Sequence, residues 1–444
     1  MGAHPRDRLA RELDMTDTVM LVVSSVIGSG IFLTPVTVAG LLPHPGAILA
    51  VWLVGGLLSL AGALANAELG AMYPWAGGDY VYLREGYSPA AGFMIGWLSF
   101  FVIYAGTVAS LAAAFGEAVG HPLGLGGGPI LGLAITATLV ISAINYLGVR
   151  RGLSVNNWAS TAKLVGIAVF TTAAFALGSG DPARLLPLVT GVTDAVPAAA
   201  FGLALSPVLF TYLGWNAPVF VASEIHDPGR TVPRALFLGL GICTAAYLAL
   251  NVVYLYALPL DALRSEPNAG AAAARALFGP LAGRLVGAFV IVSILGTLHA
   301  TILVGPRIAY AMALDDLFVG GAAEVHTINR TPHRAIVIQA IVAVALLLVL
   351  RRFPSVLDYT TFAIVLATMA DTAALYRLRR VRPGLPRPYQ AWGYPVVPAL
   401  YVIANAGVAA AMIRGRPYQC AIGIAVLMTG LPFYYWLRPS VKPL

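Results

Sequence analysis

Apolar segments long enough to cross a bilayer recur along almost the whole chain. A helix needs about 20 apolar residues to span the hydrocarbon core. Only 10% of the 444 residues are charged and 59% are hydrophobic, whereas a soluble domain carries about 25% charged residues. The sequence therefore predicts an all-α integral membrane protein with twelve transmembrane helices, at about 16–41, 46–71, 89–118, 128–149, 158–178, 197–224, 233–258, 281–312, 335–351, 354–377, 395–413 and 418–436.

The placement of basic residues predicts the orientation of the chain. With twelve spans both termini lie on one side, and the loops and tails of that side hold eighteen basic residues against eight on the other. Basic residues accumulate in cytoplasmic loops, so we expect a multi-pass protein of the cell inner (cytoplasmic) membrane with both termini cytoplasmic. This bias also accounts for the net charge of +8 without nucleic-acid binding. The first apolar span is too long for a signal-peptide core, so it is expected to be retained.

Cysteine usage gives no sign of a disulfide framework or a metal site. Cys243 and Cys420 are the only cysteines, and both lie in apolar stretches. No spacing of cysteine and histidine resembles a metal-ligand motif. We expect neither a metal ion nor another cofactor.

Glycine and proline interrupt two of the predicted spans. The first contains "SSVIGSGIFLTP" (24–35) and the sixth contains "FTYLGWNAPVF" (210–220). Paired interruptions at corresponding places of two halves mark the binding site in many transporters. Because the breaks lie five spans apart, they predict two five-helix repeats of opposite orientation, at about 16–178 and 197–377. No residue-level similarity between the halves supports this repeat.

The two breaks together could bind the head of an α-amino acid. Glycines at 28 and 30 let the backbone leave helical geometry and approach a ligand closely. The freed N–H groups lie at the N-terminal end of the following half-helix, which favours a carboxylate. Freed carbonyls in the sixth span suit an ammonium group. The alternative is that Gly28, Ser29 and Gly30 are small residues at a helix-packing seam.

Four ordered motifs resemble one transporter family. "IGSGIF" (27–32) is similar to the first-helix motif of the amino acid–polyamine–organocation superfamily. "NAELGAMYPWAGGDYVYLREGYSP" (66–89), "LFTYLGWNAPVFVASEIHDPGRTVPRAL" (209–236) and "ILGTLHATILVGPRIAYAMALDDLF" (294–318) resemble segments of its L-type amino acid transporter branch. The similarity is clear over the first eight spans and general over the last four.

The resemblance implies a fold and a mechanism. The fold would be a ten-helix inverted-repeat core of the leucine-transporter type in residues 1–390, with helices 1 and 6 unwound. Helices 11 and 12 and a short cytoplasmic tail would occupy 391–444. Transport would proceed by alternating access around a site at the middle of the membrane. The chain would be a secondary transporter of neutral L-amino acids that is independent of sodium and works by exchange or proton coupling.

The resemblance also implies roles for individual residues. Main-chain amides near Ser29 and Gly30, with Ile27 and Gly28 adjoining, would hold the substrate carboxylate. The carbonyls of Phe210, Thr211 and Leu213 would hold its amino group, and the Phe210 ring would cover the substrate from outside. Asn216 would tie the unwound segment together.

The chain departs from the family pattern in two places. Animal members of the branch join a heavy chain through a cysteine after the third helix, and here that loop, "EAVGHPLGLGGG", has none. A disulfide-linked heavy chain is therefore not expected, and a stand-alone microbial transporter is. The eighth helix carries His299 where the pattern is usually small or amide-bearing. This histidine could touch substrate or titrate with pH, or it could be a hydrogen-bonded packing residue.

Lys163 is one of only two lysines, against 25 arginines, and it lies in the predicted fifth span. It could snorkel to the cytoplasmic headgroups, although Arg150 and Arg151 already mark that side. The family resemblance ("TAKL") places it instead against the unwound part of helix one. There its ammonium would bridge freed carbonyls near Val26 or Ile27 and residues of span eight. Such a lysine would couple substrate occupancy to conformation and could carry a proton.

The acidic residues of the spans have several possible roles. Glu68 could relay protons or pin a loop to a helix end, and we favour the second. Glu224 and Asp227 could form a gate with Arg230 and Arg234 or belong to a solvated loop. Asp371 is expected to reach the cytoplasmic surface near Arg377. No carboxylate is evident near the middle of the membrane, which predicts a neutral substrate side chain.

Other functions remain as alternatives. A cationic amino acid or polyamine transporter could use the same fold. A membrane-embedded enzyme would need clustered catalytic groups, and neither H-E-x-x-H nor G-x-S-x-G occurs. A channel would show rings of charge or repeated filter motifs. A transporter is therefore preferred to both.

Overall fold

The computed structural model describes residues 7–185, 196–350, 353–415 and 417–437. Within these ranges it is all-helical, and its only β-type pairings are the isolated bridges Leu13–Ile225 and Ala76–Val221. Some of the basic residues behind the predicted orientation lie outside the described residues, namely Arg6, Arg351, Arg352, Arg416, Arg438 and Lys442.

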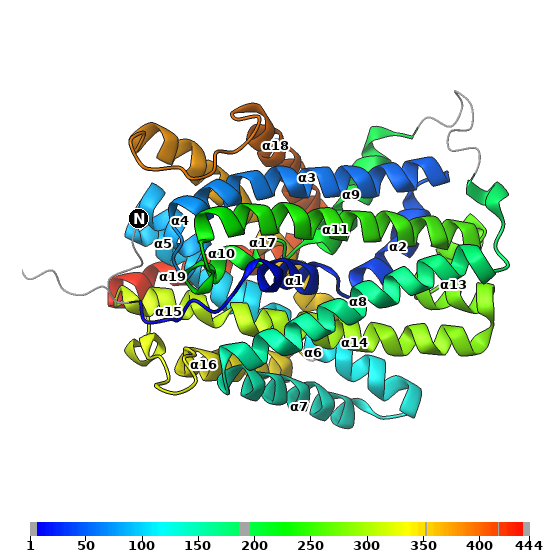
Figure 1. Ribbon diagram of the computed structural model, residues 1–444, viewed down its shortest axis with the longest axis horizontal. Coiled ribbons are helices and arrows are strands. Elements are labelled where there is room, and N and C mark those ends of the chain that lie inside the picture. Colours follow the sequence, from blue (N-terminus) through cyan, green and yellow to red (C-terminus); the bar gives the residue numbers. More distant parts are fainter. Residues whose placement is uncertain (1–6, 186–195, 351–352, 416, 438–444) are drawn as a thin grey trace, which may run out of the picture.

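The helices run mostly along the long axis of the molecule, with the short helices α1 and α10 near its centre (Figure 1). The first six are α1 (Met15–Val26), α2 (Gly30–Leu41), α3 (Pro45–Met72), α4 (Asp79–Gly86), α5 (Pro89–Leu98) and α6 (Ala105–Gly120). The middle of the chain forms α7 (Gly127–Tyr146), α8 (Val149–Leu177), α9 (Ala198–Tyr212), α10 (Ala217–Phe220), α11 (Pro228–Ala257), α12 (Leu260–Ser265) and α13 (Ala269–Phe278). The remainder forms α14 (Pro280–Val304), α15 (Pro306–Leu314), α16 (His333–Leu350), α17 (Phe353–Val381), α18 (Val396–Gly415) and α19 (Pro417–Leu437).

Membrane-spanning length is confirmed for most of the predicted spans. In the described residues nine helices are long and apolar enough to cross a bilayer, or ten if the bent pair α1–α2 counts as one span. Shorter apolar helices, α9 and α16, lie at the predicted sixth and ninth spans. The described chain is therefore a multi-span membrane protein.

Several helix boundaries differ from the sequence-based prediction. α8 begins at Val149 rather than near 158, because its charged first turn reads as loop in a hydropathy pattern. The third span contains a π-helical turn, Ser99–Tyr104, between α5 and α6. The eighth is divided at Gly305 into α14 and α15. Helices α4, α12 and α13 were not predicted.

Both predicted breaks are present. α1 ends at Val26 and α2 begins at Gly30, with a bend of 45°. α9 ends at Tyr212 and α10 begins at Ala217. Gly214 between them has a φ of +98°, and a Cβ atom there would lie 2.8 Å from the Ser25 carbonyl oxygen. Glycine is therefore required for the second break to approach the first.

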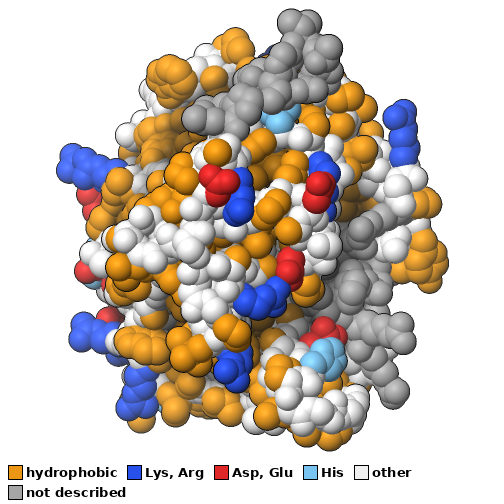
Figure 2. Space-filling view, turned by 90° about the vertical axis from the view of Figure 1, so that its right-hand side faces the viewer, with side chains coloured by type: hydrophobic (Ala, Val, Ile, Leu, Met, Phe, Trp, Pro, Cys, Tyr) orange, Lys and Arg blue, Asp and Glu red, His pale blue; other side chains and the backbone are white. Residues whose placement is uncertain are grey.

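The end of the molecule that carries the N label in Figure 1 is closed by main-chain contacts. The N–H groups of Glu12 and Leu13 donate to the Glu224 carbonyl oxygen at 2.8 and 2.9 Å. Among the residues that the structure describes, the opposite end shows scattered charged side chains among hydrophobic ones (Figure 2).

Candidate substrate site

A cavity of about 130 Å³ lies between the two helix breaks. One water needs about 10–15 Å³ of such volume, so the cavity has room for a small organic molecule. Its walls come from both breaks and from α4, α6, α14, α17 and the π-helical turn. The lining includes Ser25, Gly28, Ser29, Gly30, Asp79, Tyr104, Phe210, Thr211, Leu213, Asn216, Phe220, Thr297 and Thr368.

The first break presents free N–H groups to this cavity. Gly28, Ser29 and Gly30 all line it. Among the described residues, no acceptor takes the N–H of Ser29 or Gly30, which begin α2. The Gly28 N–H is already donated to the Val26 carbonyl oxygen at 2.9 Å. Two donors therefore lie at the electropositive end of a half-helix.

Ile27 does not line the cavity as expected. Its carbonyl oxygen accepts from the Ser293 hydroxyl at 3.2 Å and from Lys163 at 2.6 Å. It therefore supports the break rather than meeting a ligand there.

The second break presents main-chain carbonyls and two side chains. Phe210, Thr211 and Leu213 line the cavity. The Phe210 carbonyl accepts from the Leu213 N–H at 3.1 Å, while no described residue donates to the Leu213 carbonyl. Asn216 also lines the cavity, and its side chain makes no hydrogen bond to a described residue, so the expected tie across the segment is not seen.

Tyr247 joins the two breaks, and its role was not predicted from the sequence. Its buried hydroxyl lies 2.7 Å from the Val26 carbonyl oxygen and 3.0 Å from that of Thr211. A phenol has one hydrogen, so it donates to one of these carbonyls at a time. No sequence signal singles out Tyr247, because the predicted seventh span also contains Thr244, Asn251, Tyr254 and Tyr256.

Lys163 lies where the sequence predicted. Its Nζ atom is fully buried and donates to the Ser24 carbonyl at 3.0 Å, the Ile27 carbonyl at 2.6 Å and Thr297 Oγ1 at 2.9 Å. All three ammonium hydrogens therefore have acceptors, two in span one and one on α14. This geometry excludes snorkelling to the headgroups.

His299 is a packing residue and does not line the cavity. Its Nε2 atom lies 2.8 Å from the Gly152 carbonyl oxygen, and its Nδ1 atom lies 3.4 Å from Asn145 Nδ2. A neutral ring that donates from Nε2 and accepts at Nδ1 satisfies both contacts. It joins α14 to α7 and α8.

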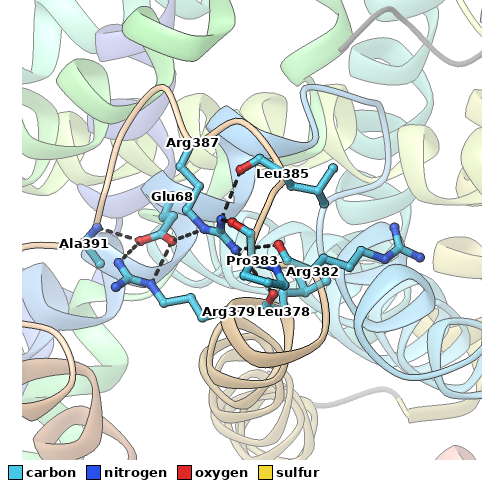
Figure 3. Close-up of polar contacts among 8 residues, drawn as sticks. All are labelled: Glu68, Leu378, Arg379, Arg382, Pro383, Leu385, Arg387 and Ala391. Atoms are coloured by element: carbon cyan, nitrogen blue, oxygen red, sulfur yellow. Dashed lines mark hydrogen bonds and ion pairs between the residues drawn. The ribbon is translucent and has the colours of Figure 1, made fainter.

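Glu68 holds a loop against α3 (Figure 3). The Arg379 guanidinium binds it in a bidentate pair at 3.0 and 2.6 Å, and Arg387 Nε lies 3.2 Å away. The Ala391 N–H donates to the same carboxylate at 2.7 Å. Glu68 is fully buried, so these contacts compensate for its desolvation. The loop-pinning interpretation is confirmed.

Glu224 forms the second buried ion pair, but not with the arginines that the sequence suggested. Arg307 holds it through Nε at 2.7 Å and Nη2 at 2.9 Å, and both side chains are at most 2% exposed. Asp227 instead forms an exposed pair with Arg230 at 3.9 Å. Of these two carboxylates, only Glu224 takes part in a buried ion pair.

Two carboxylates differ from their predicted positions. Asp371 was expected at the surface near Arg377, but it is fully buried. Asp79 lines the cavity, so the expectation that no carboxylate lies there was wrong. The helix α17 continues to Val381, which places Asp371 about 15 Å from its end.

A cavity between two broken membrane helices, with free N–H groups on one side and carbonyls on the other, defines a membrane transporter rather than an enzyme. The chain belongs to the amino acid permease family, whose model matches residues 13–437. This confirms the family inferred from the four motifs.

Known transporters resemble the chain over nearly its full length. It is 32% identical to the serine/threonine exchanger SteT of Bacillus subtilis (strain 168), over 98% of this chain and 99% of that protein. It is 29% identical to the human b(0,+)-type amino acid transporter 1, over 98% and 91%. It is 28% identical to the human large neutral amino acids transporter small subunit 2, over 96% and 80%. The chain is an amino acid transporter.

Proposed function

We propose that this protein moves neutral L-amino acids across the cytoplasmic membrane by alternating access, independently of sodium, by exchange or proton coupling. The observation that carries the proposal is the pairing of unused N–H groups at Ser29 and Gly30 with an unused carbonyl at Leu213 around one cavity. A zwitterionic α-amino acid head matches these two sets of groups. A resemblance to a serine/threonine exchanger favours exchange.

The proposed binding roles rest on the free N–H groups of Ser29 and Gly30 and the free carbonyl of Leu213, while the Phe210 carbonyl, which already accepts from the Leu213 N–H, would use its second lone pair. The N–H groups of Ser29 and Gly30 would hold the carboxylate. The carbonyls of Phe210 and Leu213 would hold the amino group, and that of Thr211 would share its lone pairs with Tyr247. The Phe210 ring, only partly buried at the cavity wall, would cover the substrate.

The proposed membrane arrangement keeps twelve spans with both termini cytoplasmic. Helices α1 to α8 would form one five-span repeat (about 16–178), and α9 to α17 its inverted counterpart (about 197–377). Residues 1–390 would form the transport core, and 391–444 would add two helices. The paired breaks in α1–α2 and α9–α10 support this division.

Lys163 is the proposed coupling residue. Its ammonium occupies three acceptors that a bound sodium ion could otherwise use. A fixed cation at this place favours sodium-independent transport. The same contacts join α8 to the first break and to α14. A rearrangement of the break on substrate binding would therefore change the packing of α8 and α14.

We also propose that the protein works without a disulfide-linked heavy chain. Both cysteines, Cys243 and Cys420, are buried. Neither is placed to bond to a partner at the surface.

A second candidate substrate class is a cationic amino acid or polyamine. The observation that favours it is Asp79 at the cavity wall, since a carboxylate could meet a cationic side chain. Asp79 is only 1% exposed and contacts a second carboxyl group, Asp371. We therefore prefer neutral substrates.

Competition in proteoliposomes tests the proposal. Purified protein would be reconstituted with internal L-serine, and uptake of labelled L-serine measured against alanine, threonine, leucine, arginine, lysine and putrescine. Neutral amino acids are expected to compete, with or without sodium. Stronger competition by arginine, lysine or putrescine would support the second candidate, and absence of amino acid uptake both by exchange and under an imposed proton gradient would contradict the assignment.

A further inference from the structure

A group of buried polar atoms that have no hydrogen-bond partner among the described residues lies beside the substrate cavity. It comprises one oxygen of Asp79, both oxygens of Asp371, both amide atoms of Asn66 and the Tyr82 hydroxyl. All four side chains are at most 1% exposed. Buried polar groups almost always have hydrogen-bond partners. This number of unpartnered atoms in one place therefore points to a missing ligand.

The four side chains converge from three helices. Asp79 and Tyr82 lie on α4, Asn66 on α3 and Asp371 on α17. The carboxyl groups of Asp79 and Asp371 interact directly with each other, and the Asn66 side chain is a neighbour of Asp371 without a hydrogen bond to it. Two carboxylates accept hydrogen bonds but cannot donate them. Direct contact is therefore satisfied only when one of them carries a proton.

No nearby positive charge neutralises this pair. Among the described residues, neither carboxyl group forms an ion pair with arginine, lysine or histidine, unlike Glu68 and Glu224. The other groups near the pair are neutral. The Ser99 hydroxyl, from the π-helical turn, donates to Asp79 at 3.3 Å. The neighbouring titratable groups are the phenols of Tyr82, Tyr104 and Tyr401. Two adjacent carboxylates cannot both be ionised cheaply in such surroundings.

We propose that Asp79 and Asp371 share one proton and form a proton-binding site that opens into the substrate cavity, separate from Lys163. Asp79 lines the cavity and Asp371 lies behind it. A proton from cavity water would bind to Asp79, and the protonated carboxyl would donate to its neighbour. Transport would thus respond to proton occupancy of the cavity wall.

A proton fits this site better than a metal cation. In the described part of the chain no group of three or more histidine, cysteine, aspartate or glutamate side chains could hold a metal. The proposal therefore commits to a proton, and sodium becomes an outcome of the test.

Infrared spectroscopy of the purified, full-length protein tests the site without any substrate, so its result is independent of the proposed transport function. At neutral pH the native protein should show a protonated-carboxyl C=O band that shifts in D2O and disappears on alkaline titration. Asp371→Asn and Asp79→Asn should each remove the band. Asp227→Asn is the matched control, because Asp227 is exposed and its φ of +43° suits asparagine, and it should leave the band unchanged.

Two results would overturn the proposal. One is a native spectrum without such a band at neutral pH, which decides the question even if the variants fail to fold. The other is loss of the band on adding sodium chloride but not choline chloride, which would indicate a sodium site. In transport, a one-proton site would change the apparent affinity by up to about tenfold per pH unit, and Asp371→Asn should flatten this dependence.

Discussion

The Lys163 Nζ atom lies 2.6 Å from the Ile27 carbonyl oxygen, inside the break between α1 and α2. The contact joins the fifth predicted span to the segment whose N–H groups face the cavity. It explains how a broken membrane helix is tolerated, because the carbonyl freed by the break finds a buried donor. The break is therefore part of a network that includes Ser24 and Thr297.

Gly30 should tolerate no side chain. A Cβ atom there would lie 2.9 Å from Thr211 Cγ2, and overpacking costs about 1–3 kcal/mol. Gly30→Ala should therefore weaken substrate affinity about tenfold or more, measured as the half-saturation concentration for exchange. Gly40→Ala, on the same helix but outside the cavity lining, is the control, since a Cβ atom there would meet no neighbour within 4 Å.

Removing the opposing methyl group should partly restore Gly30→Ala. Thr211→Ser deletes Cγ2 and keeps the hydroxyl that reaches Thr34 Oγ1 at 3.0 Å. Equal half-saturation concentrations for Gly30→Ala with and without Thr211→Ser would show that the close approach of the two breaks is not what limits binding.

Tyr247→Phe should loosen both breaks. It removes the only hydroxyl that bridges the Val26 and Thr211 carbonyls, and a buried acceptor left unsatisfied costs about 1–3 kcal/mol. We expect a lower midpoint of thermal unfolding and a lower transport rate. Tyr254→Phe, on the same helix, is the control, because the Tyr254 hydroxyl has no hydrogen-bond partner among the described residues. Equal behaviour of the two variants would refute the bridging role.

Glu68→Gln should destabilise the protein without changing substrate affinity. Glu68 is buried and lies outside the cavity lining, so breaking its pairs with Arg379 and Arg387 should cost about 3–5 kcal/mol. Thermal unfolding of the purified variant measures this. Arg150→Gln breaks only an exposed, solvent-screened pair with Glu12 and should leave the midpoint of thermal unfolding close to the native value. A stability loss no larger for Glu68→Gln than for Arg150→Gln would contradict the loop-pinning role.

The sequence predicted those parts of the site that depend on residues close together along the chain. Glycine and proline in apolar spans mark breaks, and a single lysine among arginines in a span needs buried acceptors. Both signals lie within a few residues of the feature they predict. The position of the first break, with Gly30, could therefore be read from the sequence, whereas the placement of Lys163 against that break was implied by the family resemblance.

Contacts between distant segments could not be read in this way. Tyr247 reaches two breaks that lie 221 and 36 residues away. The meeting of Asp79 and Asp371 depends on how α4 and α17 pack. A carboxylate near the end of an apolar segment was assigned to the surface because the charged last turns of α17 looked like loop.

Exchange by Lys163→Ala in proteoliposomes tests the central claim most directly. The native protein and the variant would be compared at equal reconstituted amounts, with sodium and with choline, after size-exclusion chromatography confirms that both are folded. We predict equal native rates in the two salts and loss of most exchange in the variant, because the break loses all three ammonium contacts. A variant that exchanges at the native rate, or a native protein that requires sodium, would contradict the account.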